Sequence, residues 1–218
     1  MGWKSAARSR VRGHRVATAP APRPAKLGRA TGKVVLIGAS TGGVEALKEV
    51  LMGLPSDCPP ILVTQHMPAR FTTAFANRLN KDCPMKVSEA SHNEIIEPGH
   101  VYIAPAGRHL TLRRNATGQV LTYLDVRPLD TPHRPSVDTL FQSAADVYGA
   151  RVLGIVMTGM GSDGREGAAW IKAKGGMVLT ESEASCVVYG MPRSIVEAGL
   201  SDGEVLLDRM ADAVLERL

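Results

Sequence analysis

The sequence predicts an α/β fold with three layers, helix/sheet/helix, built on a mostly parallel, doubly wound sheet with an antiparallel hairpin insertion. Short apolar runs, such as residues 33–38 and 152–160, alternate with segments whose apolar residues have helical spacing. Strands buried on both faces give such runs, and their alternation with amphipathic helices predicts a parallel sheet covered by helices. Residues 100–124 instead alternate between apolar and polar side chains, which is typical of antiparallel strands.

The predicted elements follow one another in a regular order. The first strand, KVVLIG at 33–38, ends in glycine, and the segment 44–54 after it has helical apolar spacing. Further strands are expected at 60–66, 152–160, 177–181 and 204–207, and further helices at 71–79, 165–174, 191–198 and 209–217. The insertion at 100–124 is expected to be a hairpin that turns at Asn115–Gly118.

The basic charge of the chain is concentrated in residues 1–32. These hold eight Lys or Arg side chains and no acid, which leaves 18 basic against 21 acidic groups in the remainder. The segment APAPRPA at 19–25 favours an extended, solvated chain. We therefore expect residues 1–32 to be a disordered, basic, Pro-containing tail or linker and residues 33–218 to form one α/β domain. An acid-free, Arg-rich start also fits a mitochondrial transit peptide.

Composition excludes several classes of function. Aromatic residues make up only 4% of the chain, too few for stacking on nucleic acid, so we expect no nucleic-acid partner. No run of 18 apolar residues occurs, so we expect no membrane insertion. The three cysteines, Cys58, Cys83 and Cys186, are an odd number without close spacing. They exclude a disulfide framework and fit a reducing compartment, so we expect the cytoplasm.

The first candidate site residue is Ser40, in the sequence Gly38-Ala39-Ser40-Thr41-Gly42-Gly43 between a predicted strand and a helix. This segment fits G-x-S-x-G, in which small neighbours let a tight turn present the serine oxygen. Two alternatives are a Gly-rich phosphate loop and a tight turn whose Ser or Thr caps the helix.

His66 and Asp163 are the other two candidates. His66 follows the apolar run ILVT after one residue, Gln65, and Asp163 follows a buried strand in Thr158–Gly164. Each has a structural alternative, since a lone histidine is often only a satisfied polar residue, and Ser162 or Asp163 would cap the next helix. The carboxyl ends of parallel strands meet at one edge of the sheet, so Ser40, His66 and Asp163 should converge there. A nucleophile, a base and an orienting carboxylate are the set that acyl chemistry requires.

Competing sites fit less well. A dinucleotide site requires an acid after the second strand, where this chain has Gln65 and His66, and a P-loop requires Lys after the glycines, where it has Val44. The order Ser, His, Asp also differs from that of α/β-hydrolases. Cys186 has no obvious partner and is interpreted as a buried thiol. No metal-ligand spacing occurs, so neither a metal nor a cofactor is expected.

Six blocks of the sequence resemble the catalytic domain of bacterial chemotaxis protein-glutamate methylesterases of the CheB type, in that family's order over residues 33–218. The blocks are VVLIGASTGGVEAL, ILVTQHMP, HVYIAPAGRHL, HRPSVDTLFQSAA, VLGIVMTGMGSDG and ESEASCVVYGMP. The resemblance implies a serine esterase that removes methyl esters from receptor glutamates, releases methanol and also deamidates receptor glutamines. By motif, its nucleophile corresponds to Ser40, its base to His66 and its orienting carboxylate to Asp163.

The resemblance also implies partners. The substrate would be the cytoplasmic helical bundle of a methyl-accepting chemotaxis receptor, and a receiver domain or a chemotaxis kinase would be a further partner in a longer chain. Typical members carry an N-terminal receiver domain, whereas about 32 residues precede the first strand here, so the chain is either a catalytic half with its linker or a stand-alone homologue. Ser162 stands where alanine is common in such proteins. The alternative functions are a binding module with an idle triad and a hydrolase of small esters.

Overall fold

The computed structural model describes residues 32–218, and the predicted tail lies outside this range apart from Gly32. Its centre is a seven-stranded sheet in the order β3-β4-β2-β1-β7-β8-β9, in which all neighbouring strands are parallel. The strands are β1 (Val34–Ala39), β2 (Ile61–Gln65), β3 (Lys86–Glu89), β4 (His100–Ile103), β7 (Val152–Val156), β8 (Met177–Glu181) and β9 (Glu204–Val205). A separate antiparallel pair consists of β5 (His109–Arg114) and β6 (Val120–Asp125).

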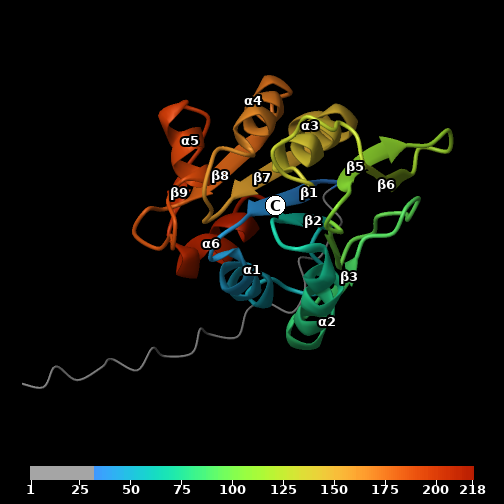
Figure 1. Ribbon diagram of the computed structural model, residues 1–218, viewed down its shortest axis with the longest axis horizontal. Helices are drawn as coiled ribbons and strands as arrows, with labels where there is room; N and C mark the ends of the chain where they lie inside the picture. The colour runs from blue at the N-terminus through green and yellow to red at the C-terminus, as the bar shows by residue number, and fades with distance from the viewer. Residues whose placement is uncertain (1–31) are drawn as a thin grey trace, which may run out of the picture.

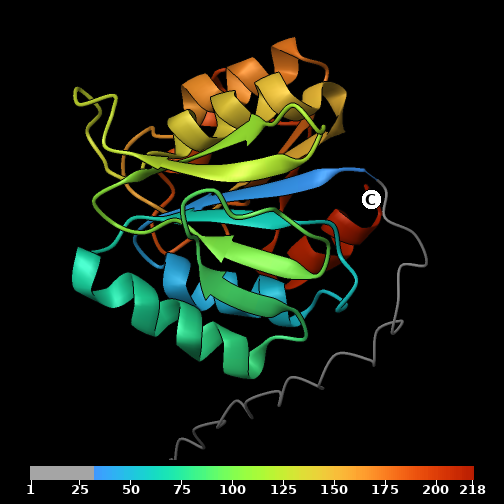
Figure 2. The same ribbon diagram turned by 90° about the vertical axis from the view of Figure 1, so that its right-hand side faces the viewer.

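Helices cover both faces of the sheet (Figure 1). They are α1 (Gly43–Met52), α2 (Thr72–Asp82), α3 (Val137–Tyr148), α4 (Arg165–Ala173), α5 (Met191–Glu197) and α6 (Leu207–Leu215). The first, second and sixth lie on one face and the third to fifth on the other, and Figure 2 shows the sheet between the two layers. Val35 and Ile37 of β1 pack in one core cluster and Val34 and Leu36 in the other, since side chains alternate along a strand. The predicted three-layer, doubly wound fold is confirmed.

The order of the strands creates a switch point at the centre of the sheet. From β1 the chain adds β2 and β4 on one side and then returns to add β7, β8 and β9 on the other. β1 is therefore the direct neighbour of both β2 and β7. In open α/β sheets, sites form at such points, outside the carboxyl ends of the strands.

The prediction for the middle of the chain was wrong in part. Only β5 and β6 form the antiparallel hairpin, in a register from His109 opposite Asp125 to Arg114 opposite Val120. β4, predicted as part of that hairpin, pairs in parallel with β2 and β3 in the main sheet. Its alternating polar residues, His100 and Tyr102, are buried rather than exposed. Each polar side chain has a partner there, because Ser88 Oγ lies 2.7 Å from His100 Nε2 and Tyr102 Oη accepts a hydrogen bond from the Glu97 amide.

Two elements were not predicted. β3 is a short edge strand with one exposed and two half-buried side chains, so it lacks the apolar run of the central strands. The other is α3, whose buried residues are nevertheless spaced as in an amphipathic helix: Val137, Leu140, Phe141, Ala144 and Ala145. Among residues 32–218, no helix combines the length and the apolar character needed to cross a bilayer.

Candidate active site

The three candidate residues lie at the switch point of the sheet. Ser40 directly follows β1, His66 directly follows β2, and Asp163 lies in the loop between β7 and α4. β1 and β2 are still paired at their ends, since the His66 amide donates to the Ala39 carbonyl at 3.0 Å. The three strands that carry the candidates are therefore adjacent and end at the same edge.

The turn at Ser40 depends on close contacts that only glycine allows. Gly42 has a φ of 84°, and a Cβ there would lie 2.7 Å from the Val187 side chain. A Cβ at Gly159, on the neighbouring loop, would lie 2.7 Å from Cβ of Ser40. The amide of Ser40 donates to the Thr158 carbonyl at 2.9 Å. The loop after β7 thus packs directly against the serine, and the glycines permit this approach.

Gln65 joins the backbone of the serine to that of the histidine. Its side chain is almost fully buried, and Nε2 donates to the carbonyl oxygens of both Ser40 and His66 at 2.9 Å. Gly43 leaves room for this amide, because a Cβ there would lie 2.1 Å from Gln65 Oε1. Gln65 was noticed in the sequence only as a misfit for a ribose site, and its role in fixing the two loops was missed.

His66 and Asp163 form a buried hydrogen-bonded pair. His66 Nε2 lies 2.8 Å from Asp163 Oδ2, and the two side chains are only 9% and 8% exposed. The other ring nitrogen, Nδ1, is buried and has no hydrogen-bond partner among residues 32–218. A carboxylate at Nε2 favours the tautomer with the proton on that atom, so Nδ1 is left as an acceptor. No hydrogen bond joins Ser40 Oγ to His66 within the same range.

The carboxylate of Asp163 is held by the N-terminus of α3. It accepts hydrogen bonds from Ser136 Oγ at 3.0 Å, from the Val137 amide at 2.8 Å and from the Asp138 amide at 2.9 Å. Burial alone would raise its pKa. The hydrogen bonds from His66 and from the Asp138 and Val137 amides outweigh burial, so the pKa of Asp163 lies below its usual range and the group is ionised. Asp163 was considered as a cap of α4, but it caps α3 instead.

The N-terminus of α4 is capped by Asp138, which no sequence signal had singled out. Its Oδ1 accepts from the Gly164 amide at 2.9 Å and from the Gly167 amide at 2.7 Å. Burial, together with the nearby charge of Asp163, raises the pKa of Asp138. The two helices are therefore capped reciprocally. Asp163, just before α4, caps α3, and Asp138, in α3, caps α4. Ser136 before the helical spacing of α3 is the signal that would have located this helix start.

Two backbone N–H groups near the serine are free. Among residues 32–218, the amides of Thr41 and Met160 donate no hydrogen bond. Thr41 follows Ser40, and Met160 follows Gly159, which contacts it. Free amides beside a nucleophile are able to bind an oxyanion.

Other chemistry has less support in the described residues. Within 32–218, no group of three or more His, Cys, Asp or Glu side chains is arranged to hold a metal ion. Burial, and then the charge of Glu181, raise the pKa of Cys186 to about 12, so its thiol is protonated near neutrality and is a poor nucleophile.

Comparison with known proteins places the chain in a family. Residues 35–214 match the family model described as CheB methylesterase. A protein-glutamate methylesterase/protein-glutamine glutaminase of Dechloromonas aromatica is 46% identical over 91% of this chain and 57% of its own length. One of Methylobacillus flagellatus is 50% identical over 85% of this chain and 52% of its own length.

A solved structure agrees with both relatives. The crystal structure of the Thermotoga maritima CheB methylesterase catalytic domain superposes with a TM-score of 0.84 at 39% identity, over 86% of this chain and all of that one. The chain spans little more than half the length of the two curated relatives. By its family model, its relatives and its fold, this chain belongs to the CheB methylesterase family.

Proposed function

We propose that residues 33–218 are the catalytic domain of a serine hydrolase that removes methyl esters from glutamate side chains of methyl-accepting chemotaxis receptors and also deamidates receptor glutamines. The observation that carries this proposal is the buried hydrogen bond between His66 and Asp163, beside a serine on a glycine-rich turn. The pairing is that of a base and its orienting carboxylate, in a chain whose relatives bear the names of these two activities.

In the proposed reaction Ser40 is the nucleophile and His66 the base. Nδ1 of His66, which has no hydrogen-bond partner in the described part of the chain, takes the proton of Ser40 as Oγ attacks the ester carbonyl. It returns a proton to the leaving methoxy group, and methanol departs. Water then attacks the acyl-enzyme by the same route and releases the free glutamate. Asp163 stays ionised and stabilises the imidazolium.

The free amides of Thr41 and Met160 would bind the oxyanion that forms on the substrate carbonyl. For a glutamine substrate the same steps release ammonia instead of methanol. Ser40 is half-buried, while Val187, which lies against Gly42 of its turn, and Met160, which follows Gly159, are 70% and 71% exposed, so the nucleophile would lie at an open surface. An open surface suits a side chain on a long helical bundle better than a closed pocket would.

The setting of this activity is part of the proposal. The substrate is the cytoplasmic bundle of the receptor, so the enzyme would work in the cytoplasm. Residues 1–32 would be a tail or linker, and a receiver domain or a chemotaxis kinase would be further partners of a longer chain. We propose neither a nucleic-acid partner nor a cofactor.

The test is methanol release from a methylated receptor bundle, compared with release from a small soluble methyl ester. The wild-type chain should prefer the receptor, and Ser40→Ala should lose at least about a thousandfold in turnover, since triad members act as a unit. Ser162→Ala is the matched control, because this serine is exposed at the same edge and its hydroxyl makes no hydrogen bond within residues 32–218.

Three results would count against the proposal. Near wild-type turnover by Ser40→Ala would remove the nucleophile. No methanol release by the wild type, with intact binding to the receptor, would favour a binding module. Faster release from the soluble ester than from the receptor would indicate a hydrolase of small esters.

A further inference from the structure

The face of the His66 ring is covered by a second histidine. The ring of His133 stacks on it with centroids 4.0 Å apart and planes 21° from parallel. His133 is itself exposed, whereas the His66 side chain is only 9% exposed. The stacked ring therefore stands between the imidazole of His66 and solvent.

The loop that carries His133 is fixed by the site itself. Ser136, three residues after His133, donates a hydrogen bond from Oγ to the Asp163 carboxylate. His109 contacts both ends of this loop. Its Nε2 lies 3.0 Å from the Pro128 carbonyl oxygen, and its Nδ1 accepts a hydrogen bond from the Ser136 amide at 3.2 Å. The carboxylate that binds His66 from the edge thus also anchors the segment that covers its face.

The surroundings of His133 favour its neutral form, chiefly through partial burial of its ring. Burial, and then the nearby His66, lower the pKa of His133, while the charge of Asp163 opposes them. Arg134, the next residue, donates its guanidinium to the Leu129 carbonyl on its own loop. A neutral aromatic ring attracts a cation held over its face, and during the proposed reaction His66 becomes a cation.

We propose that His133 is a positioning residue, whose stacked ring keeps His66 in the orientation that leaves Nδ1 facing away from Asp163 and stays in contact with it as it gains a proton. This inference rests on the proposed function. Nothing in it requires His133 to touch the substrate. A flat ring is what the role needs, so phenylalanine should replace His133 and alanine should not.

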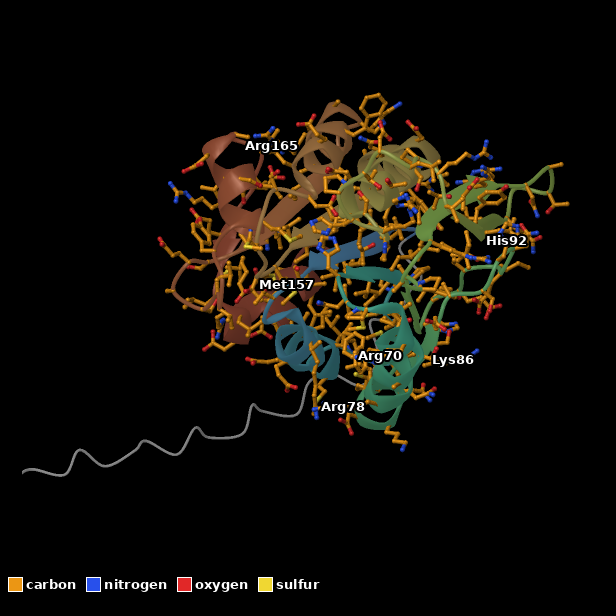
Figure 3. All side chains as sticks on the ribbon, viewed as in Figure 1. Arg70, Arg78, Lys86, His92, Met157 and Arg165 are labelled. Atoms are coloured by element: carbon orange, nitrogen blue, oxygen red, sulfur yellow. The ribbon has the colours of Figure 1, made fainter. Side chains whose placement is uncertain are left out.

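The experiment compares His133→Ala and His133→Phe with the wild type over a range of pH. In His133→Ala, turnover should fall about tenfold with little change in KM, because a stacked cation contact contributes on that scale. The midpoint of its pH–rate profile should move by about half a unit or more. His133→Phe should keep turnover within about threefold. His92→Ala is the matched control, because His92 is also an exposed histidine whose ring contacts another ring, that of Tyr123, though at a tilt. It lies beside the hairpin, away from Met157, which follows β7 (Figure 3).

A second measurement does not depend on activity. NMR titration of the histidine ring nitrogens should show a changed midpoint for His66 in His133→Ala and not in His92→Ala. If turnover, pH profile and titration of His133→Ala all match the wild type, the inference is overturned. It is also overturned if His133→Phe is as impaired as His133→Ala. If the wild type releases no methanol, the proposed function fails, and the titration still decides whether the stack acts on His66.

Discussion

The two sides of His66 differ in how firmly they are held. At Nε2 the ring meets a carboxylate that accepts three further hydrogen bonds from the start of α3. At Nδ1 it has no partner among residues 32–218, and one face is covered by the exposed ring of His133 on a loop. The orientation of His66 is therefore set by a carboxylate that helix backbone holds, while Nδ1, the proposed proton acceptor, is buried without a partner among the described residues.

The two sides of His66 should also contribute differently to stability and to activity. The fixed side of His66 consists of Asp163 and the start of α3 that holds it. These groups also join α3 to α4, since Asp163 caps α3 and Asp138 caps α4. Changes there should lower both the free energy of unfolding and, for Asp163, the turnover. Changes at Ser40 or His133 should lower turnover alone, because neither side chain holds an element in place.

The largest combined effect is expected for Asp163→Asn. The amide nitrogen of asparagine cannot accept the backbone N–H groups or hold His66 in the required tautomer. We expect turnover to fall by roughly a thousandfold or more and the free energy of unfolding to fall by about 1–3 kcal/mol. Kinetics and urea unfolding measure the two. Asp130→Asn, at an exposed loop position, is the matched control. Turnover within about tenfold of wild type would mean that Asp163 only caps α3.

Asp138→Ala tests the fixed side without changing His66 or its hydrogen bond to Asp163. It removes the acceptor for the Gly164 and Gly167 amides, so the free energy of unfolding should fall by about 1–2 kcal/mol. Turnover should change by less than about tenfold, since Asp163 keeps its own hydrogen bonds. Unchanged urea unfolding would refute the reciprocal capping.

Acid should weaken the fixed side first. The pKa of Asp163 is lowered from 3.8 to about 2, so its hydrogen bonds stabilise the folded state fully above about pH 4 and are lost as pH falls toward 2. This contributes about 2 kcal/mol, which Asp163→Asn should lack. Urea unfolding at pH 6 and at pH 3 measures the difference. An equal loss on acidification in wild type and variant would contradict the assignment.

The smallest effect is expected for deletion of residues 1–30. The segment 1–32 holds eight basic groups, no acid and no apolar pattern, so it lacks the apolar side chains that packing over the candidate site would require. Turnover and melting temperature should stay the same, and any loss should appear as weaker receptor binding at low salt. Several-fold higher turnover of the shortened chain at both low and moderate salt would show that the segment masks the site.

Sequence patterns predicted the parts of the fold that are buried on both faces. The apolar runs that became β1, β2 and β7 located the sheet, and the strand-end rule then predicted Ser40, His66 and Asp163 as candidates, which the structure places at the same edge. The features that the sequence patterns missed depend on contacts between segments that are distant in the chain. The polar residues of β4 have hydrogen-bond partners inside the core, whereas the alternation of polar and apolar residues had predicted that they would be exposed. The partner of Asp163 is a helix 25 residues earlier in the chain, and no local pattern relates His133 to His66.

Labelling with a fluorophosphonate, located by mass spectrometry of the digested protein, would show directly whether Ser40 is an activated nucleophile. A phosphonate reacts readily only with an activated serine, so we expect one adduct, on Ser40 and not on Ser162. The rate should fall by about a hundredfold or more in His66→Ala, since the histidine removes the proton. An adduct on another serine, no adduct on the wild type, or equal labelling of His66→Ala would contradict the claim that His66 activates Ser40.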